Sequence, residues 1–309
     1  MSKLISIVTP TFNEEGNIEK LCGSISKEMS KTNFDYEHIV IDNSSTDNTI
    51  KILKELSKKS KKLKVIINKK NFGHIRSPMH GMFQASGDAV ILMMSDLQDP
   101  IELITKYIEE WENGSKVVMG QKDSSDENFL KHHIKNIAYK FINKISDNPL
   151  LINTTGSGLY DKSIIDIIKK IDDPYPYFRG LISEITNETK LIKYHQPKRL
   201  KGKTKNNFYT LYDIGILGIV KHSKIPLRLM TFLGFLFSFF SILTAIIFFI
   251  YKLIYWDSFD LGIAPIIIGV FALGSVQILI LGFIGEYVMN ILIQTRKLPL
   301  VYEKERINF

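Results

Sequence analysis

Residues 89–100 read Ala89-Val90-Ile91-Leu92-Met93-Met94-Ser95-Asp96-Leu97-Gln98-Asp99-Pro100. An apolar run that stops abruptly at acidic and amide side chains is typical of a buried strand that ends at the carboxyl edge of a parallel sheet. Carboxylate and amide oxygens at such an edge can bind a hard cation and a phosphate. The stretch therefore predicts an α/β fold with a site for a metal ion and a phosphorylated ligand.

The rest of the front half alternates between strand and helix patterns. A βαβα order of this kind predicts a mainly parallel sheet with right-handed crossovers. We expect Ser45 or Thr46 to cap the second helix and Pro100 to stand in the first turn of the fourth. The predicted strands are Leu4–Thr9, Tyr36–Asp42, Leu63–Asn68, Ala89–Met94 and Lys116–Gly120, and the predicted helices lie near Asn17–Met29, Asp47–Ser60, His74–Ala85 and Pro100–Asn113.

Three further stretches carry motifs in a consistent order: residues 5–15 (ISIVTPTFNEE), 40–47 (VIDNSSTD) and 199–205 (RLKGKTK). Together with the Asp96-Leu97-Gln98-Asp99-Pro100 turn they resemble glycosyltransferase family 2, and within it the transferases that act on polyprenyl phosphate. The resemblance implies a GT-A type nucleotide-diphosphosugar transferase domain that needs Mg²⁺ or Mn²⁺. It also implies a nucleoside-diphosphate sugar as donor, with a UDP-sugar favoured, and inversion at the sugar.

The same resemblance implies roles for individual residues. Asp96 and Gln98 would hold the metal, and Asp99 is a further oxygen candidate. Asp96 and Arg179, which precedes Gly180, would face the reacting groups, although a structural ion pair is an equally open reading of Arg179. Arg199, Lys203 and Lys205 would bind the acceptor phosphate, whereas a solvated basic run that favours anionic lipid is the alternative. The nucleotide-binding residues would be Pro10, Thr11, Asn13, Glu14, Asp42, Asn43 and Ser95.

Three positions depart from the family pattern. Met94 stands where the first acid of the Asp-x-Asp motif belongs, and Asn43 follows Asp42 where a second acid is usual. Gly156 and Ser157 replace a turn that carries an acid in the family. A phosphate acceptor with a second pKa near 6 is already ionised at neutral pH, so it needs no such base. Two alternatives stay open: transfer to a saccharide hydroxyl, and a catalytically weakened membrane scaffold.

Two long uncharged stretches follow. No charge lies between Arg228 and Lys252, nor between Asp260 and Glu286, and each gap is long enough for a membrane-spanning helix. Basic residues flank the outer ends, so the positive-inside rule predicts that both termini and the catalytic domain are cytoplasmic. We expect a multi-pass protein of a bacterial inner membrane without a signal peptide, and two buried core helices are the alternative.

Composition agrees with this organisation. A net charge of +8 suits an anionic membrane face and nucleotide diphosphates, and the chain lacks the aromatic-studded basic platform of nucleic-acid binders. The lone Cys22 excludes an internal disulfide. Small residues in the second span favour a homo-oligomer. The expected parts are a transferase domain (1–205), a juxtamembrane amphipathic helix (206–225), a two-helix anchor (226–290) and a cytoplasmic tail (291–309).

Overall fold

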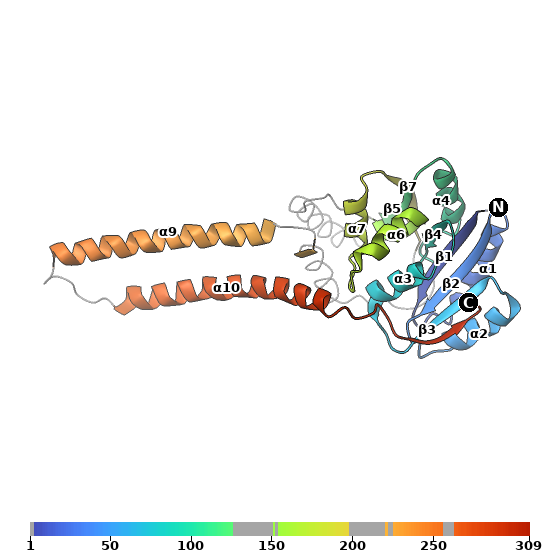
Figure 1. The fold of residues 1–309 in the computed structure, drawn as a ribbon, viewed down its shortest axis with the longest axis horizontal. Coiled ribbons are helices and arrows are strands. Elements are labelled where there is room, and N and C mark those ends of the chain that lie inside the picture. The colour runs from blue at the N-terminus through green and yellow to red at the C-terminus, as the bar shows by residue number, and fades with distance from the viewer. Residues whose placement is uncertain (1–2, 126–150, 152–153, 198–219, 222–224, 256–262) are drawn as a thin grey trace.

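The computed structural model describes residues 3–125, 151, 154–197, 220–221, 225–255 and 263–309 (Figure 1). Its described strands form one sheet in the order β7-β5-β6-β4-β1-β2-β3-β8. Strands β1, β2, β3, β4, β5 and β7 all run in one direction, whereas β6 and β8 are antiparallel to their neighbours. The strands are β1 (Leu4–Thr11), β2 (Asp35–Asp42), β3 (Leu63–Asn68), β4 (Ala89–Leu92), β5 (Val117–Ser125), β6 (Thr154–Asp161), β7 (Thr189–Gln196) and β8 (Glu303–Ile307).

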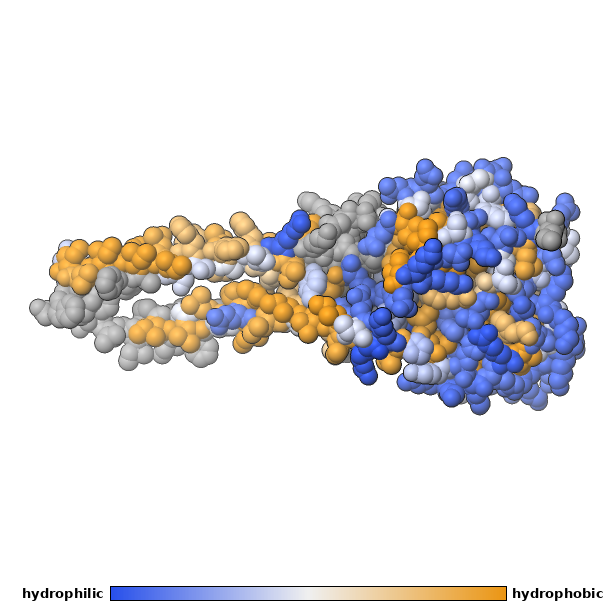
Figure 2. Space-filling view, in the orientation of Figure 1, coloured by the Kyte–Doolittle hydropathy of each residue, from blue (hydrophilic) through white to orange (hydrophobic). Residues whose placement is uncertain are grey.

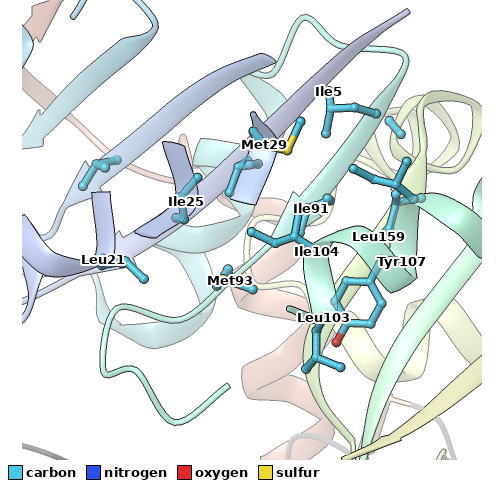
Figure 3. Close-up of a cluster of buried hydrophobic side chains, with 14 of the residues drawn as sticks. Ile5, Leu21, Ile25, Met29, Ile91, Met93, Leu103, Ile104, Tyr107 and Leu159 are labelled. Atoms are coloured by element: carbon cyan, nitrogen blue, oxygen red, sulfur yellow. The ribbon is translucent and has the colours of Figure 1, made fainter. Parts of the chain in front are cut away.

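Helices cover both faces of the sheet, because its central strands are apolar on both sides. Ile5 and Ile7 of β1 pack in one core with α1, α2 and α4, and Val8 packs in a second core with α3, α6 and α7. Figure 3 shows the first core, in which Tyr107 of α4 lies among aliphatic side chains. The helices are α1 (Ile18–Met29), α2 (Thr49–Lys59), α3 (Gly73–Phe83), α4 (Leu103–Glu112), α6 (Lys162–Ile171) and α7 (Phe178–Ile185).

The predicted mainly parallel α/β sheet is confirmed, and two local expectations were wrong. Helix α2 begins after Asn48, whose side chain makes no capping hydrogen bond, and the Asp47 carboxylate accepts from the Thr49 amide instead. Ser45 is unavailable as a cap because it bonds to Asp42. Helix α4 begins at Leu103, so Pro100 lies before its first turn.

Strand β8 is the largest surprise of the fold. It comes from the segment expected to be a tail, yet it pairs antiparallel with β3 at the edge of the sheet. Polar contacts hold it there: Glu303 bonds to His80 of α3, and Glu305 forms an ion pair with Lys54 of α2. The chain thus returns from its second apolar helix to complete the sheet. Here "sheet domain" means the eight strands together with helices α1 to α7.

Helices α9 (Ile225–Ile254) and α10 (Ile263–Thr295) project side by side from the sheet domain (Figure 1). Both are long and apolar enough to cross a membrane, by length and composition. Their apolar side chains lie outside any core of the described residues, since only 6% of the Leu227–Thr244 window and 0% of the Leu273–Thr295 window is buried. Figure 2 shows this apolar surface beside the hydrophilic sheet domain. Two buried core helices, the alternative from the sequence, do not describe this arrangement.

Candidate active site

The predicted site residues that the structure describes gather at one edge of the sheet. Because six strands run in one direction, the loops after β1, β2, β3, β4 and β7 leave from the same edge. Asp42 is the last residue of β2, and the loops after β1, β2 and β4 carry Asn13, Asn43 and Asp96. In open α/β sheets this carboxyl edge is where ligands bind.

Three non-glycine residues at this edge adopt left-handed backbone conformations. They are Asn13 (φ 56°), Ser44 (φ 67°) and Leu97 (φ 56°), one in each loop after β1, β2 and β4. Such a conformation is costly for a residue with a large side chain, and for Leu97 above all. It persists where surrounding contacts hold the loop, which is a feature of sites built to bind a ligand.

The loops after β1 and β2 hold each other in place. The Asn13 amide donates to Ser45 Oγ at 2.8 Å, and the Thr46 amide donates to Asn13 Oδ1 at 2.8 Å. The buried Glu14 amide donates to Thr49 Oγ1, and its carboxylate accepts from Asn17 at 2.6 Å. The predicted nucleotide loop is therefore preformed, with Asn13 and Glu14 serving its architecture as well as any ligand.

Asp42 and Thr11 lie at the ends of the neighbouring strands β2 and β1. The Asp42 carboxylate is buried and accepts from both the amide and the hydroxyl of Ser45, at 2.8 and 2.5 Å. Burial raises the pKa of Asp42 despite these two bonds. The buried Thr11 hydroxyl has no hydrogen-bond partner in the described part of the chain. A bound polar ligand could supply one. Pro10, beside it, is half-buried.

Asn43, the residue after β2, makes four hydrogen bonds to the end of β3 and to the segment that follows it. Its Oδ1 accepts from the Asn68 side chain and from the Phe72 amide, and its Nδ2 donates to Asn71 Oδ1 and to the Gly73 carbonyl. These four bonds use all the hydrogen-bonding capacity of a side-chain amide in its plane. The geometry thus assigns Asn43 a positioning role that the sequence did not suggest.

The Asp96 turn presents one hard oxygen ligand. Ser95 is buried, Asp96 is half-buried, and the Gln98 amide donates to Asp96 Oδ1 at 3.2 Å. Gln98 Nε2 lies 3.5 Å from the Pro197 carbonyl beyond β7, which leaves Gln98 Oε1 as a second oxygen. Met94 is half-buried and packs against the second core. Its thioether is too soft a donor to replace the missing acid for a hard cation.

The described residues contain no group of three or more His, Cys, Asp and Glu side chains that could hold a metal ion alone. This donor set still fits Mg²⁺ or Mn²⁺, because Mg²⁺ is commonly held by one or two carboxylates together with water and substrate phosphates. Asp96 and Gln98 would hold such an ion only jointly with a diphosphate. Metal and nucleotide should therefore bind together.

A buried polar cluster beneath the turn was missed by sequence reasoning. Asp99 is 4% exposed, and Tyr194 of β7 donates to its Oδ1 at 2.5 Å. Burial raises the pKa of Asp99, whereas the hydrogen bond from Tyr194 stabilises the ionised carboxylate and lowers the pKa. The hydroxyls of Tyr107 and Ser157 lie nearby in the same buried region. Asp99 thus anchors the turn to β7 and is not an exposed metal ligand.

Arg179 lies at the start of α7, beyond the end of β4. Its Nη1 donates to the Thr154 carbonyl at 3.0 Å and its Nη2 to the Tyr177 hydroxyl at 3.2 Å. Burial lowers the pKa of His74 on α3, and the Arg179 charge lowers it further. Arg179 therefore links the start of β6 to the residue that precedes α7. Arg199, Lys203 and Lys205, the predicted acceptor residues, lie outside the described residues.

A three-layer α/β domain with hydrogen-bonded loops at its carboxyl edge and one acidic turn there is the architecture of a GT-A type transferase. The sequence profile described as "Glycosyl transferase family 2" matches residues 6–168. The chain belongs to this family and is a glycosyltransferase.

Its relatives span nearly the whole chain. CsbB of Bacillus subtilis (strain 168) is 32% identical over 302 residues, covering 98% of this chain and 92% of its own length. The "Prophage bactoprenol glucosyl transferase homolog" of Escherichia coli (strain K12) is 29% identical over 303 residues, with 96% of each chain covered. The "Bactoprenol glucosyl transferase" of Shigella phage SfV is 29% identical over 296 residues, again with 96% of each covered.

Solved structures agree on the fold. Glucosyl-3-phosphoglycerate synthase from Mycobacterium tuberculosis, in complex with uridine diphosphate, has a TM-score of 0.50 and 18% identity. The similarity covers 71% of this chain and 78% of that one. At this identity the likeness supports the architecture alone.

Proposed function

We propose that this chain transfers a sugar from a nucleoside-diphosphate sugar, with a UDP-sugar favoured, to polyprenyl phosphate, with inversion. The observation that carries the proposal is the combination of one acidic turn at a preformed nucleotide edge with two long apolar helices in the same chain. Relatives named as bactoprenol glucosyl transferases support the same acceptor class.

The chemistry requires one bond to break and one to form at the anomeric carbon. The nucleoside diphosphate leaves with the bonding electron pair, while an acceptor oxygen attacks the opposite face of the sugar. A bound Mg²⁺ or Mn²⁺ neutralises charge on the leaving group. Asp96 and Gln98 would hold that ion, and the loops of Asn13 and Asp42 would fix the nucleoside.

The acceptor class follows from the absent base. Ser157 is buried on β6 at the position where the resembling family carries an acid. A sugar hydroxyl would need that acid to remove its proton, whereas an ionised phosphate monoester needs only to be held. Arg179, together with Arg199, Lys203 and Lys205, supplies cations for this purpose. A lipid phosphate is therefore favoured over a saccharide hydroxyl.

The proposed location is the cytoplasmic face of a bacterial inner membrane, with α9 and α10 as the anchor and both termini on the cytoplasmic side. The pairing of β8 with β3 supports the last point, because it keeps the C-terminal segment on the sheet domain. A homo-oligomer through the apolar helices remains part of the proposal.

The test uses purified full-length protein, radiolabelled nucleotide sugars and polyprenyl phosphate, with products separated by thin-layer chromatography. The donor panel begins with UDP-glucose, because the named relatives are glucosyl transferases. We expect labelled polyprenyl phosphate that requires Mn²⁺ or Mg²⁺ and disappears on chelation. Label in a lipid-linked saccharide only would support the hydroxyl acceptor instead, and no transfer with any donor would support the weakened scaffold.

A further inference from the structure

Helix α6 carries an exposed apolar pair that the active site does not use. Ile164, Ile165 and Ile168 are buried, whereas Ile167 and Ile171 are 42% and 45% exposed. Among the described residues before Ile225 these two are the exposed large apolar side chains. They lie four positions apart, so they share one side of the helix.

One end of the apolar hairpin, α9 with α10, attaches directly beside this pair. Lys221, four residues before α9 begins, forms an ion pair with Asp173 at 2.6 Å and donates to the Tyr175 carbonyl. Both partners of this ion pair are buried, at 8% and 9% exposed side chain. Asp173 lies two residues after Ile171, so the C-terminal end of α6 is fixed next to the start of α9.

The other end of the hairpin attaches to the neighbour of α6. Arg76 of α3 donates to the Pro299 carbonyl at 2.5 Å, four residues after α10 ends. Leu300 packs against the core that α3 and α6 share. Lys169 of α6 also lies over the ring of Phe83, at the end of α3. The two ends of the hairpin therefore contact the sheet domain at α3 and just after α6 (Figure 1).

We propose that the exposed side of α6, Ile167 with Ile171, lies against the bilayer surface. The inference rests on the proposed membrane anchoring, because α9 and α10 bring this helix to the membrane. Lys169 and Lys170 in its last turn suit the anionic phosphates of lipid headgroups. Figure 2 shows an apolar patch on the viewer-facing surface of the sheet domain, in the half nearer the hairpin. This contact would fix the tilt of the sheet domain and so the height of the active-site edge above the membrane.

The experiment places a polarity-sensitive fluorophore on single cysteines in a Cys22→Ser background, in full-length protein reconstituted into phosphatidylglycerol-containing vesicles. Ile171→Cys is the test position. Lys58→Cys on α2 is the solvent control, because α2 lies at the far end of the sheet domain from the hairpin (Figure 1). Phe235→Cys in α9, 73% exposed, is the membrane control.

We expect quencher-bearing lipids to reduce Ile171 fluorescence at least threefold more than Lys58 fluorescence, with a blue-shifted emission at Ile171. Quenching at Phe235 with none at Ile171 would overturn the α6 contact and leave the anchor intact. No quenching at Phe235 would overturn both the anchor and this inference. A blue shift at Ile171 that lipid quenchers do not affect would assign the surface to a second protein copy and also overturn the proposal.

The readout does not depend on turnover, so failure of the proposed reaction leaves it interpretable. A second variant adds a functional measurement: Ile167→Ser with Ile171→Ser should lower turnover in vesicles at least threefold and leave turnover in detergent unchanged. Equal turnover in both media, relative to the unmodified chain, would contradict a role for the contact in positioning the site.

Discussion

At the scale of single residues, we expect Asp96 to be the carboxylate of its turn that binds the metal ion. Met94 has no hard donor for such a cation, and Asp99 is buried against Tyr194. We expect Asp96→Asn to abolish turnover and to leave expression and thermal stability intact. The matched control is Glu112→Gln, the equivalent carboxylate-to-amide change at an exposed position of α4. Asp96 would leave the mechanism if the variant kept more than about a tenth of the wild-type rate, a loss of only about 1.4 kcal/mol in barrier height.

Asn43 offers a second residue-scale prediction. The sequence suggests contact with the nucleoside and hence a change of base preference in Asn43→Asp. The four bonds to the loop after β3 suggest a different result, because a carboxylate cannot donate to Asn71 Oδ1 and the Gly73 carbonyl. We expect the variant to lose about 1–3 kcal/mol of unfolding free energy. We also expect its affinity for every nucleotide-sugar donor to fall by the same factor. A change among uridine, guanosine and thymidine donors larger than the common loss would restore direct nucleoside contact.

At the scale of elements, the hydrogen bond from Tyr194 to Asp99 joins the Asp96 turn to β7. Tyr194→Phe removes the donor to the buried Asp99 carboxyl, and we expect a loss of about 1.5–3 kcal/mol of stability with a raised Mn²⁺ requirement. Tyr36→Phe on β2 is the control, because Tyr36 lies outside the buried cluster around Asp99. Titration with Mn²⁺ in the presence of UDP measures the first effect. Equal Mn²⁺ affinity in both variants would show that the bond from β7 does not affect metal binding at the turn.

Glu37 joins three elements around β2. Its carboxylate, 6% exposed, accepts from Lys64 of β3, from Ser6 of β1 and from Ser86 before β4. Burial raises the pKa of Glu37, but these bonds outweigh it and the net pKa is lowered. Since the folded pKa lies below the unfolded value of about 4.3, the stabilisation is complete above that pH and is lost as pH falls through the folded pKa.

We therefore expect Glu37→Gln to lower the unfolding free energy at pH 7 by about 1–3 kcal/mol and to flatten its decline below pH 4. Denaturant titrations between pH 3 and pH 7 make the comparison. Glu55→Gln, an exposed position on α2, is the control and should follow the wild-type curve. Parallel acid limbs for Glu37→Gln and the wild type would show that the charge of Glu37 contributes nothing.

At the scale of the whole molecule, a basic segment, residues 199–205, lies in the sequence between β7 and the first apolar helix, α9. β7 ends at the active-site edge, and Arg199, Lys203 and Lys205 follow before α9 begins. We expect Arg199→Ala and Lys205→Ala to raise KM for polyprenyl phosphate or to lower kcat strongly. Arg199→Lys should also be impaired, because the bidentate fork is lost. Near-wild-type kinetics for both alanine variants in detergent would show that these residues do not bind the acceptor phosphate and serve only as a membrane tether.

The sequence by itself determined the α/β class, the order of the first strands and the two apolar helices. These features depend on local periodicity and on runs of apolar residues, which neighbouring residues along the chain define. The motif turns around Asp42 and Asp96 were also readable, because strand ends at one edge follow from parallel order. Caps and helix starts were less so, since Ser45 could bond either to the α2 amides or to Asp42, and only the folded loop decided between them.

The tertiary structure alone decided what couples distant segments. Strand β8 has a polar sequence and forms because β3 offers an unpaired edge, 235 positions away at the Asn68–Glu303 pair. The Asp99–Tyr194 bond spans 95 residues, and the Lys221–Asp173 pair spans 48. No periodicity encodes such pairs, because each partner is an ordinary polar residue until the fold buries both and removes water as the competing partner.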